Sequence, residues 1–348
     1  MNPYVLTIFL SSLGLGTTLT FASSHWLLAW MGLEINTLAI LPLMAQHHHP
    51  RSVEATTKYF LAQATAAATI LFASMTNAWI TGQWDITHMS HPAATIMITT
   101  ALALKVGLAP MHFWMPPVLQ GLDLTTGLIM STWQKLAPFA LLIQIAPTMH
   151  PTLLTTIGIL STMIGGWGGL NQTQLRKMLA YSSIAHLGWM IVVIQFMPQL
   201  TALTLGIYII MTSTTFLTFK LLMTTKMSTL AMTWSKTPLI TTTAALALLS
   251  LGGLPPLTGF MPKWLILQEL VKQELPLTAT IMALSALLSL YFYLRLCYTM
   301  TLTIAPDTNN STTPWRLTNT QTTLPLAIFT ILTLMLLPLT PAIQALVY

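Results

Sequence analysis

The sequence predicts an all-α polytopic membrane protein with about eleven transmembrane helices. Charged residues make up only 6% of its 348 residues, and hydrophobic residues make up 54%. A soluble domain carries about 25% charged residues, so this chain could not cover a water-exposed surface. Asp, Glu, Lys and Arg are absent from four stretches, each longer than the roughly 20 residues that a helix needs to cross a membrane: 1–33, 136–175, 178–219 and 317–348.

The predicted helices of the first half follow from these stretches and from the prolines and charges between them. The chain opens with Met-Asn-Pro-Tyr and no basic segment, so we expect a retained span rather than a cleaved signal peptide. Five spans are predicted before the first long break, at residues 3–21, 25–44, 56–80, 93–119 and 125–146.

The second half divides in the same way. The two charge-free stretches in the middle of the chain are each long enough for two helices, with breaks at Ala146–Pro151 and Met197–Leu200. Six further spans are predicted, at residues 150–171, 175–195, 200–224, 239–271, 276–303 and 323–346.

The distribution of Lys and Arg predicts the orientation. Connections after odd-numbered spans hold only Lys272, whereas those after even-numbered spans hold Arg51, Lys58, Arg176, Lys177, Lys226, Lys236 and Arg316. Positive residues favour the inner side of a membrane. We therefore expect the N-terminus inside and, with eleven spans, the C-terminus outside.

The fourth and ninth spans contain the same interruption. Gly107-Leu-Ala-Pro and Gly253-Leu-Pro-Pro, 146 residues further along, are each followed by Met-Pro at the same spacing. Proline removes a helical hydrogen bond, so each span should be broken. Paired broken spans are typical of inverted-repeat transporters. They predict a five-helix repeat over 1–146, an inverted second over 147–303, and a connection with a last span over 304–348. Chance convergence of two Pro-rich loops is the alternative.

Several chemistries are excluded. The single cysteine, Cys297, cannot supply the roughly four thiolates of an iron–sulfur cluster. Neither a dinucleotide-binding nor a P-loop glycine pattern occurs. The scattered positive charges do not form the clustered stripe that nucleic-acid binding needs. No metal site is expected, and the His47-His48-His49 triplet is better explained as a solvated loop.

Four charged residues inside the predicted spans are the candidate functional residues: Glu34, Lys105, Lys135 and Lys263. Each costs roughly 2.5–3.5 kcal/mol at a helix centre, and charges retained at that cost usually serve transport. Lys105 and Lys263 adjoin the two breaks, and Glu34 is predicted to be the only acid in the membrane interior. The alternatives are a structural ion pair for Glu34, structural roles for Lys105 and Lys135, and a connecting segment for Lys263.

Two histidines are further candidates. His112 lies in the first break, and His186 lies in the middle of the seventh predicted span. A neutral imidazole in a polar membrane interior can relay protons, and it can equally be a hydrogen-bonded structural group. Both roles remain open for these two residues.

Three motifs resemble one known family. They are Leu104-Lys-Val-Gly-Leu-Ala-Pro-Met-His-Phe-Trp-Met-Pro-Pro117, Asn171-Gln-Thr-Gln-Leu-Arg-Lys-Met-Leu-Ala-Tyr-Ser-Ser-Ile-Ala-His186 and Gly252-Gly-Leu-Pro-Pro-Leu-Thr-Gly-Phe-Met-Pro-Lys-Trp264. Together they are similar to the antiporter-like membrane subunits of mitochondrial NADH:ubiquinone oxidoreductase, respiratory complex I. The similarity extends over essentially the whole chain. Bacterial relatives have about fourteen spans, and the animal form lacks the first three.

The resemblance implies an activity and a site. Such subunits of the proton-translocating NADH:ubiquinone reductase carry protons from the matrix to the intermembrane space, driven by electron transfer elsewhere in the complex. NADH, FMN, iron–sulfur clusters and ubiquinone would lie on other subunits, with no cofactor on this chain. In the family a glutamate pairs with a lysine, here Glu34 and Lys105. The relay continues through Lys135 and the central histidine position, His186, to Lys263.

The resemblance also implies surroundings and leaves a rival function open. The chain would lie in the mitochondrial inner membrane, in contact with other complex I subunits and phospholipids. A self-standing cation/proton antiporter is the alternative function, although binding of Na⁺ would favour several carboxylates where this chain offers Glu34 among lysines. A purely structural subunit is the second alternative, and it gives the buried charges no purpose.

Overall fold

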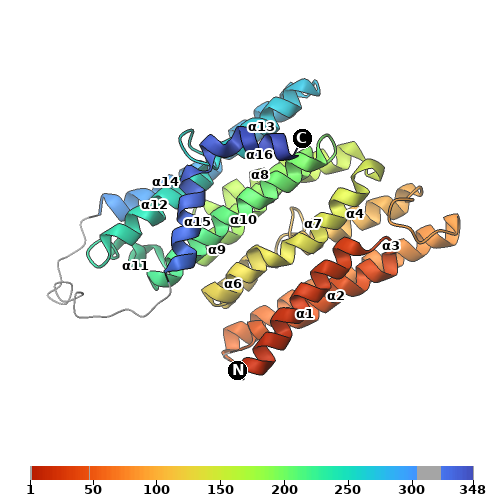
Figure 1. The fold of residues 1–348 in the computed structure, drawn as a ribbon, viewed down its shortest axis with the longest axis horizontal. Coiled ribbons are helices and arrows are strands. Elements are labelled where there is room, and N and C mark those ends of the chain that lie inside the picture. Colours follow the sequence, from red (N-terminus) through yellow and green to blue (C-terminus); the bar gives the residue numbers. More distant parts are fainter. Residues whose placement is uncertain (1, 47, 304–322, 348) are drawn as a thin grey trace.

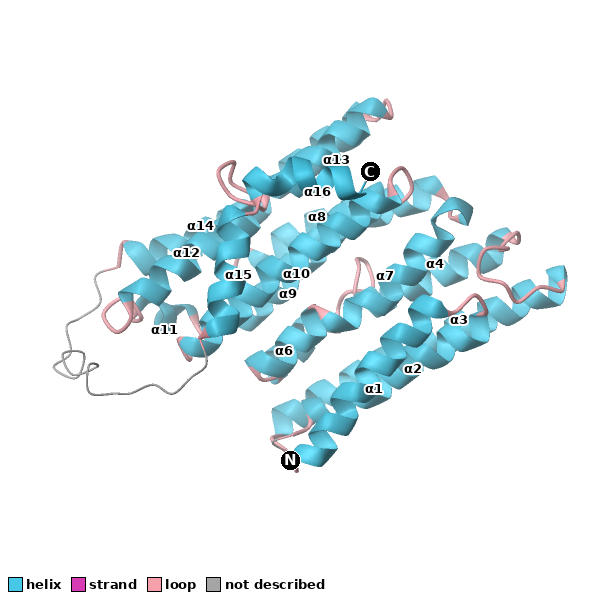
Figure 2. Ribbon diagram, viewed as in Figure 1, coloured by secondary structure: helices cyan, strands magenta, loops and turns pink. Residues whose placement is uncertain are grey.

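The computed structural model describes residues 2–46, 48–303 and 323–347. Within these ranges the chain is helical and forms no β-strand (Figure 2). His47, Arg316 and the rest of the predicted connection over 304–322 lie outside the described residues. The predicted all-α class is therefore confirmed for the described part of the chain.

The first half of the chain forms one side of the bundle, where α1 and α2 lie beside the α6–α7 segment (Figure 1). Proline occupies the first turn of α1, α3 and α4, where its missing N–H costs no hydrogen bond. The helices are α1 (Pro3–Ala22), α2 (Trp26–Met44), α3 (Pro50–Thr81), α4 (Pro92–Val106), α5 (Met115–Gly121), α6 (Leu124–Ser131), α7 (Trp133–Ile145) and the 3₁₀ turn η1 (Ala146–Thr148).

The second half contributes the other side of the bundle. Proline again starts α8, α10, α12 and α14. The helices are α8 (Pro151–Gly169), α9 (Leu175–Val193), α10 (Pro198–Leu221), α11 (Met227–Ala231), α12 (Pro238–Gly252), α13 (Phe260–Lys272), α14 (Pro276–Thr301), α15 (Leu324–Met335), the turn η4 (Leu337–Leu339) and α16 (Thr340–Val347).

Six helices in the described part of the chain are long and apolar enough to cross a membrane. They are α1, α2, α3, α10, α14 and the stretch Leu124–Thr148, which contains α6 and α7. The bent pair α15 and α16 adds a seventh if it is one span. Helices α4 and α12 are apolar but have only 15 residues each, because the predicted breaks end them early.

Both predicted breaks are present, and they begin in the same way. Gly107 and Gly253 follow the last turns of α4 and α12 with φ of +86° and +80°. The next residue, Leu108 or Leu254, donates its N–H to a carbonyl five residues back, and the glycine donates to one three residues back. This pairing is the Schellman motif, which needs a left-handed residue and therefore favours glycine. The repeated sequence therefore produces a repeated helix end.

Buried and half-buried side chains donate hydrogen bonds to the carbonyls that these breaks release. Trp114 Nε1 donates to Leu104 O at 3.0 Å, and Gln63 Nε2 donates to Lys105 O at 3.2 Å. At the second break, Lys263 Nζ donates to Gly252 O at 2.7 Å. An unbonded carbonyl at this depth would cost several kcal/mol. The breaks are thus stabilised structures.

Two predicted spans are less regular than the sequence indicates. The fifth, predicted as continuous over 125–146, is interrupted at Thr132 between α6 and α7, where φ is −112° and ψ is −70°. The last, predicted over 323–346, bends by 64° between α15 and the segment that follows it. Neither the interruption at Thr132 nor the short helix α11 has an obvious glycine or proline signal.

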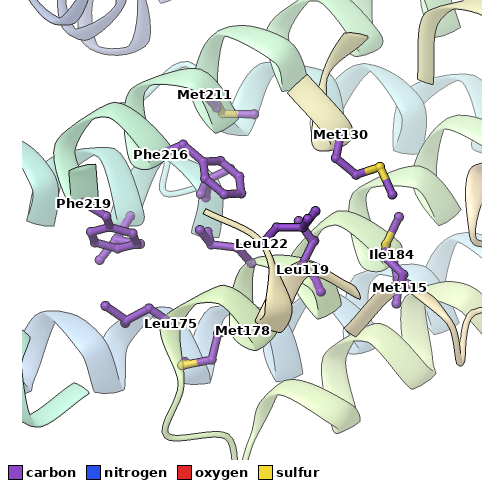
Figure 3. Packing of buried hydrophobic residues seen from close by; sticks show 14 of the residues in the cluster. Met115, Leu119, Leu122, Met130, Leu175, Met178, Ile184, Met211, Phe216 and Phe219 are labelled. Carbon is purple, nitrogen blue, oxygen red and sulfur yellow. The ribbon is translucent and has the colours of Figure 1, made fainter. Parts of the chain in front are cut away.

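The core lies where the two halves of the chain meet. Figure 3 shows Met115, Leu119 and Leu122 around α5 packed against residues of α9 and α10. All three are at most 2% exposed. Helix α5 also packs against α3, so this short helix ties the two halves together. The buried charges of the first break are held beside this junction.

The positively charged connections gather at one end of the bundle. Residues 174 and 226 form an antiparallel bridge, and Arg176 donates to Leu122 O. Arg51 and Gly121 line one groove there, and Arg176 and Lys220 line a second. Helix α13, which ends at Lys272, runs toward the opposite end, and the two termini also lie toward opposite ends (Figure 1). This segregation agrees with the charge pattern of the sequence.

Candidate functional site

All four predicted charges lie in the interior of the bundle. Lys105 is in the last turn of α4 and Lys135 in the first turn of α7, and they are 6% and 3% exposed. Glu34, in the middle of α2, and Lys263, in the first turn of α13, are half-buried. Two of the three lysines therefore sit at helix ends created by the breaks, and the third follows the unexpected interruption at Thr132.

Lys105 and Lys135 line the same cavity. Its volume is about 20 Å³, which is room for about one water molecule. Asn36, Gln63 and Gln134 add amide groups to a lining that mixes polar and apolar side chains. Gln134 Nε2 donates to Asn36 O at 3.2 Å, which joins α7 to α2 beside the cavity. The two ammonium groups thus share one small polar space.

Glu34 and Lys105 interact without a direct ion pair. The carboxylate acts electrostatically on the Lys105 ammonium, yet among the described residues the two have no N–O contact within 4.0 Å. Glu34 Oε2 and Lys105 Nζ are both buried and have no hydrogen-bond partner among the described residues. An unbonded buried charge is costly. The two groups are therefore held apart, and a hydrogen bond to either one would lower the free energy of this arrangement.

A tyrosine connects Lys135 to the second half of the chain. Lys135 Nζ donates to Tyr208 Oη at 3.3 Å and lies 5.3 Å from the centre of the same ring. Tyr208 Oη in turn donates to Ser131 O, also at 3.3 Å. Tyr208 comes from the middle of α10 and is 1% exposed. This side chain bridges the two halves at the level of the buried lysines.

His186 and Lys263 line a second cavity, which also has a volume of about 20 Å³. Tyr208 lines this cavity as well, with its ring 5.8 Å from that of His186. Tyr293 Oη lies 3.5 Å from His186 Nε2 on another side. These contacts form one line of side chains: Lys105 and Lys135 line the first cavity, and Lys135 bonds to Tyr208. Tyr208, His186 and Lys263 line the second cavity.

His112 stands apart from this line. Its Nδ1 lies 3.3 Å from Pro110 O, and its ring packs against Phe113 and Tyr181 at 4.4 and 6.5 Å between centroids. It is not among the residues that line either cavity. The contacts of His112 are those of a residue that shapes the first break.

Sequence reasoning missed several polar residues. Tyr208 and Tyr293 escaped notice because a tyrosine in an apolar run reads as core. The expectation that Glu34 is the only acid of the interior is wrong, because Glu269 near the end of α13 is 8% exposed. Glu269 pairs with Lys272 at 3.6 Å, toward the end of the bundle. Its position at a span end could have been read from the sequence.

Broken helices that bring buried lysines together at the centre of a membrane bundle define the antiporter-like class of membrane proteins. The family described as NADH:quinone oxidoreductase/Mrp antiporter, transmembrane, matches residues 23–289. The chain belongs to this family. Residues 290–344 match a second family, the C-terminus of NADH dehydrogenase subunit 2.

Close relatives carry one name. NADH-ubiquinone oxidoreductase chain 2 of Carassius auratus is 77% identical over 346 residues, which cover 99% of each chain. The proteins of the same name from Formosania lacustris and Danio rerio are 73% and 71% identical, over 100% and 99% of each chain. The resemblance inferred from the three motifs is therefore confirmed.

Solved structures share the fold. A chain of respiratory complex I from Thermus thermophilus with bound aureothin superposes with a TM-score of 0.83 at 27% identity, over 97% of this chain and 78% of that chain. A chain of the archaeal membrane-bound sulfane sulfur reductase superposes with a TM-score of 0.86, over 97% and 73%. At 17% identity this second likeness shows the fold alone.

Proposed function

We propose that this chain is a core membrane subunit of respiratory complex I that moves protons from the matrix to the intermembrane space. The observation that carries the proposal is the line of proton-carrying side chains from Lys105 to Lys263, in which the Lys135–Tyr208 hydrogen bond links the residues of one cavity to those of the other. Groups of this kind are expensive in a membrane and mark proton paths. The names and sequences of the relatives support the same assignment.

The proposed path begins at Glu34 and Lys105. A carboxylate near the Lys105 ammonium stabilises its charge, and loss of that carboxylate favours release of a proton toward Lys135 across the first cavity. The proton then passes by Tyr208 and His186 to Lys263, across the second cavity. Lys263 stands at the second break, from which the proton leaves. Since Arg would stay charged throughout, lysine suits each position that must be emptied and refilled.

The proposed architecture comprises eleven spans with two inverted repeats of five. The shared Schellman ends at Gly107 and Gly253 support the repeats, because each marks the broken helix of its half. The proposed division is 1–146, 147–303 and 304–348. Each repeat contributes one cavity, and the Lys135–Tyr208 hydrogen bond links a residue of the first to a residue of the second.

The proposed surroundings follow from the same assignment. NADH, FMN, the iron–sulfur clusters and ubiquinone belong to other subunits of the enzyme, and electron transfer there drives the protons here. The chain spans the mitochondrial inner membrane among complex I subunits and phospholipids. Its N-terminus faces the matrix and its C-terminus the intermembrane space, because the positive connections mark the inner side.

Native electrophoresis tests the assignment to a complex. After gentle solubilisation of the source membranes, this chain is expected to migrate in a large complex that stains for NADH oxidation in the gel. The same complex, reconstituted in vesicles, is expected to acidify one side only while it reduces quinone. Migration as a small species that exchanges cations for protons without NADH would show the alternative, a self-standing antiporter, to be the correct function.

The orientation has its own test. Single reporter cysteines placed within 226–236 and within 81–92, in a Cys297→Ser background, are expected to react with an impermeant thiol reagent from opposite sides of sealed vesicles. The first segment should react from the matrix side. Cys297 is buried, so its removal leaves the exposed surface unchanged. Reaction of both segments from one side would contradict the span count.

A further inference from the structure

The hydroxyl of Tyr208 has a protein group at hydrogen-bonding distance on each of two sides. It accepts from Lys135 Nζ and donates to Ser131 O, each at 3.3 Å. Hydroxyl bonds to oxygen are usually about 2.7–2.8 Å long, so this hydroxyl is held loosely. Its proton is donated to a backbone carbonyl, and no hydrogen bond joins it to His186 among the described residues.

The interruption at Thr132 makes this arrangement possible. In a continuous helix, Ser131 O would accept the N–H of Lys135, four residues further on. Here the Lys135 N–H bonds to Thr132 O at 3.3 Å instead. The Ser131 carbonyl is therefore free to receive the Tyr208 hydroxyl. The break between α6 and α7 thus sets the position of Lys135 and also frees the carbonyl that accepts the hydrogen bond of the Tyr208 hydroxyl.

Tyr208 also faces the groups that would take the proton onward. The second cavity, lined by Tyr208, His186 and Lys263, has room for about one water molecule. On its other side, the ring and the hydroxyl meet Lys135. The O–H bond can therefore rotate from Ser131 O toward the second cavity without movement of the ring.

We propose that Tyr208 is the gate of the proton path: its hydroxyl blocks transfer while it donates to Ser131 O, and it transmits when it turns toward the second cavity. This proposal rests on the function proposed above and adds a catalytic residue to it. The hydroxyl receives a proton from the Lys135 ammonium and releases its own to the water of the second cavity. That water passes one of its protons to His186. The net change is one proton from Lys135 to His186, and Tyr208 ends neutral, as it began.

Removal of the hydroxyl alone tests the gate. In the intact complex, Tyr208→Phe is expected to lower quinone-coupled NADH oxidation and proton pumping together, by about tenfold per assembled complex, since positioned proton carriers contribute roughly 10²–10⁴-fold and a water can replace part of this one. Tyr291→Phe is the matched control, because Tyr291 is 60% exposed on α14. It is expected to behave as the unmodified chain.

A second variant separates transfer from packing. Glutamine at this position, in Tyr208→Gln, offers a donor and an acceptor on a shorter side chain, but an amide does not pass on a proton. It is expected to be as slow as the Phe variant. Normal turnover per assembled complex in either variant would overturn the gate, even if less complex assembled. If Lys263→Ala turns over slowly and Tyr208→Phe turns over at the normal rate, the gate proposal is wrong and the proposed proton path stands. If both variants turn over at the normal rate, the proposed proton path is wrong as well.

Discussion

Lys263→Ala is expected to abolish most of the coupled activity of the complex. NADH oxidation and proton pumping should fall together by about 100-fold or more, the scale of a lost proton-transfer group. Lys263 is the last proton carrier of the line, and its ammonium also holds the Gly252 carbonyl at 2.7 Å. Without it, a proton that reaches His186 has no onward acceptor. The measurement is turnover and vesicle acidification per assembled complex.

Lys263→Arg separates charge from proton transfer. The guanidinium keeps a positive charge and several donors for the break, but it stays protonated at any accessible pH. We expect it to assemble and to remain slow. Lys272→Ala is the matched control, since Lys272 lies on the same helix and is 61% exposed. Full activity of the Arg variant would mean that Lys263 supplies a fixed charge and carries no proton.

Glu34→Gln is expected to leave the complex assembled and to slow it by about 100-fold, again the scale of a proton-transfer group. The structure gives the reason for intact assembly: Glu34 makes no direct ion pair among the described residues, so the amide strands no bonded partner. The loss falls on proton transfer instead, because an amide cannot gain or lose a charge beside Lys105. Glu34→Asp, with the charge on a shorter arm, should retain a partial rate.

The matched control for Glu34 is Glu54→Gln. Glu54 is an exposed acid that pairs with Lys58 on α3 and lines neither cavity of the path. Normal turnover is expected from it. A Glu34→Gln complex that assembles poorly but turns over normally would assign Glu34 a structural role.

The paired breaks could be predicted in detail because their cause is local. A glycine followed within three residues by proline forces a helix to end, and the Gly107 and Gly253 motifs repeat at one spacing. The burial of Lys105 and Lys135 could also be predicted from the sequence, since a lysine in the middle of a long apolar helix lies in the interior of the bundle. These features depend on neighbours in the sequence.

The link between the halves could not be predicted because its cause is tertiary. Ser131, Thr132 and Lys135 read as ordinary helix, and only packing against α10 brings the Tyr208 hydroxyl to the released carbonyl. Hydropathy scales also count tyrosine as nearly apolar, so they give no sign of a hydroxyl that both accepts and donates a hydrogen bond. Sequence patterns thus located the charges, while the contacts that join them required the folded bundle.

The small size of the two cavities bears on which ions can pass through the bundle. Each holds about one water molecule, whereas a hydrated sodium or potassium ion brings several, at about 30 Å³ apiece. Protons hop between fixed groups and need no such room. Cavities of this size favour the transfer of protons over the passage of hydrated cations. A proton path that excludes those cations would preserve a transmembrane voltage, worth about 2.3 kcal/mol per elementary charge for every 100 mV.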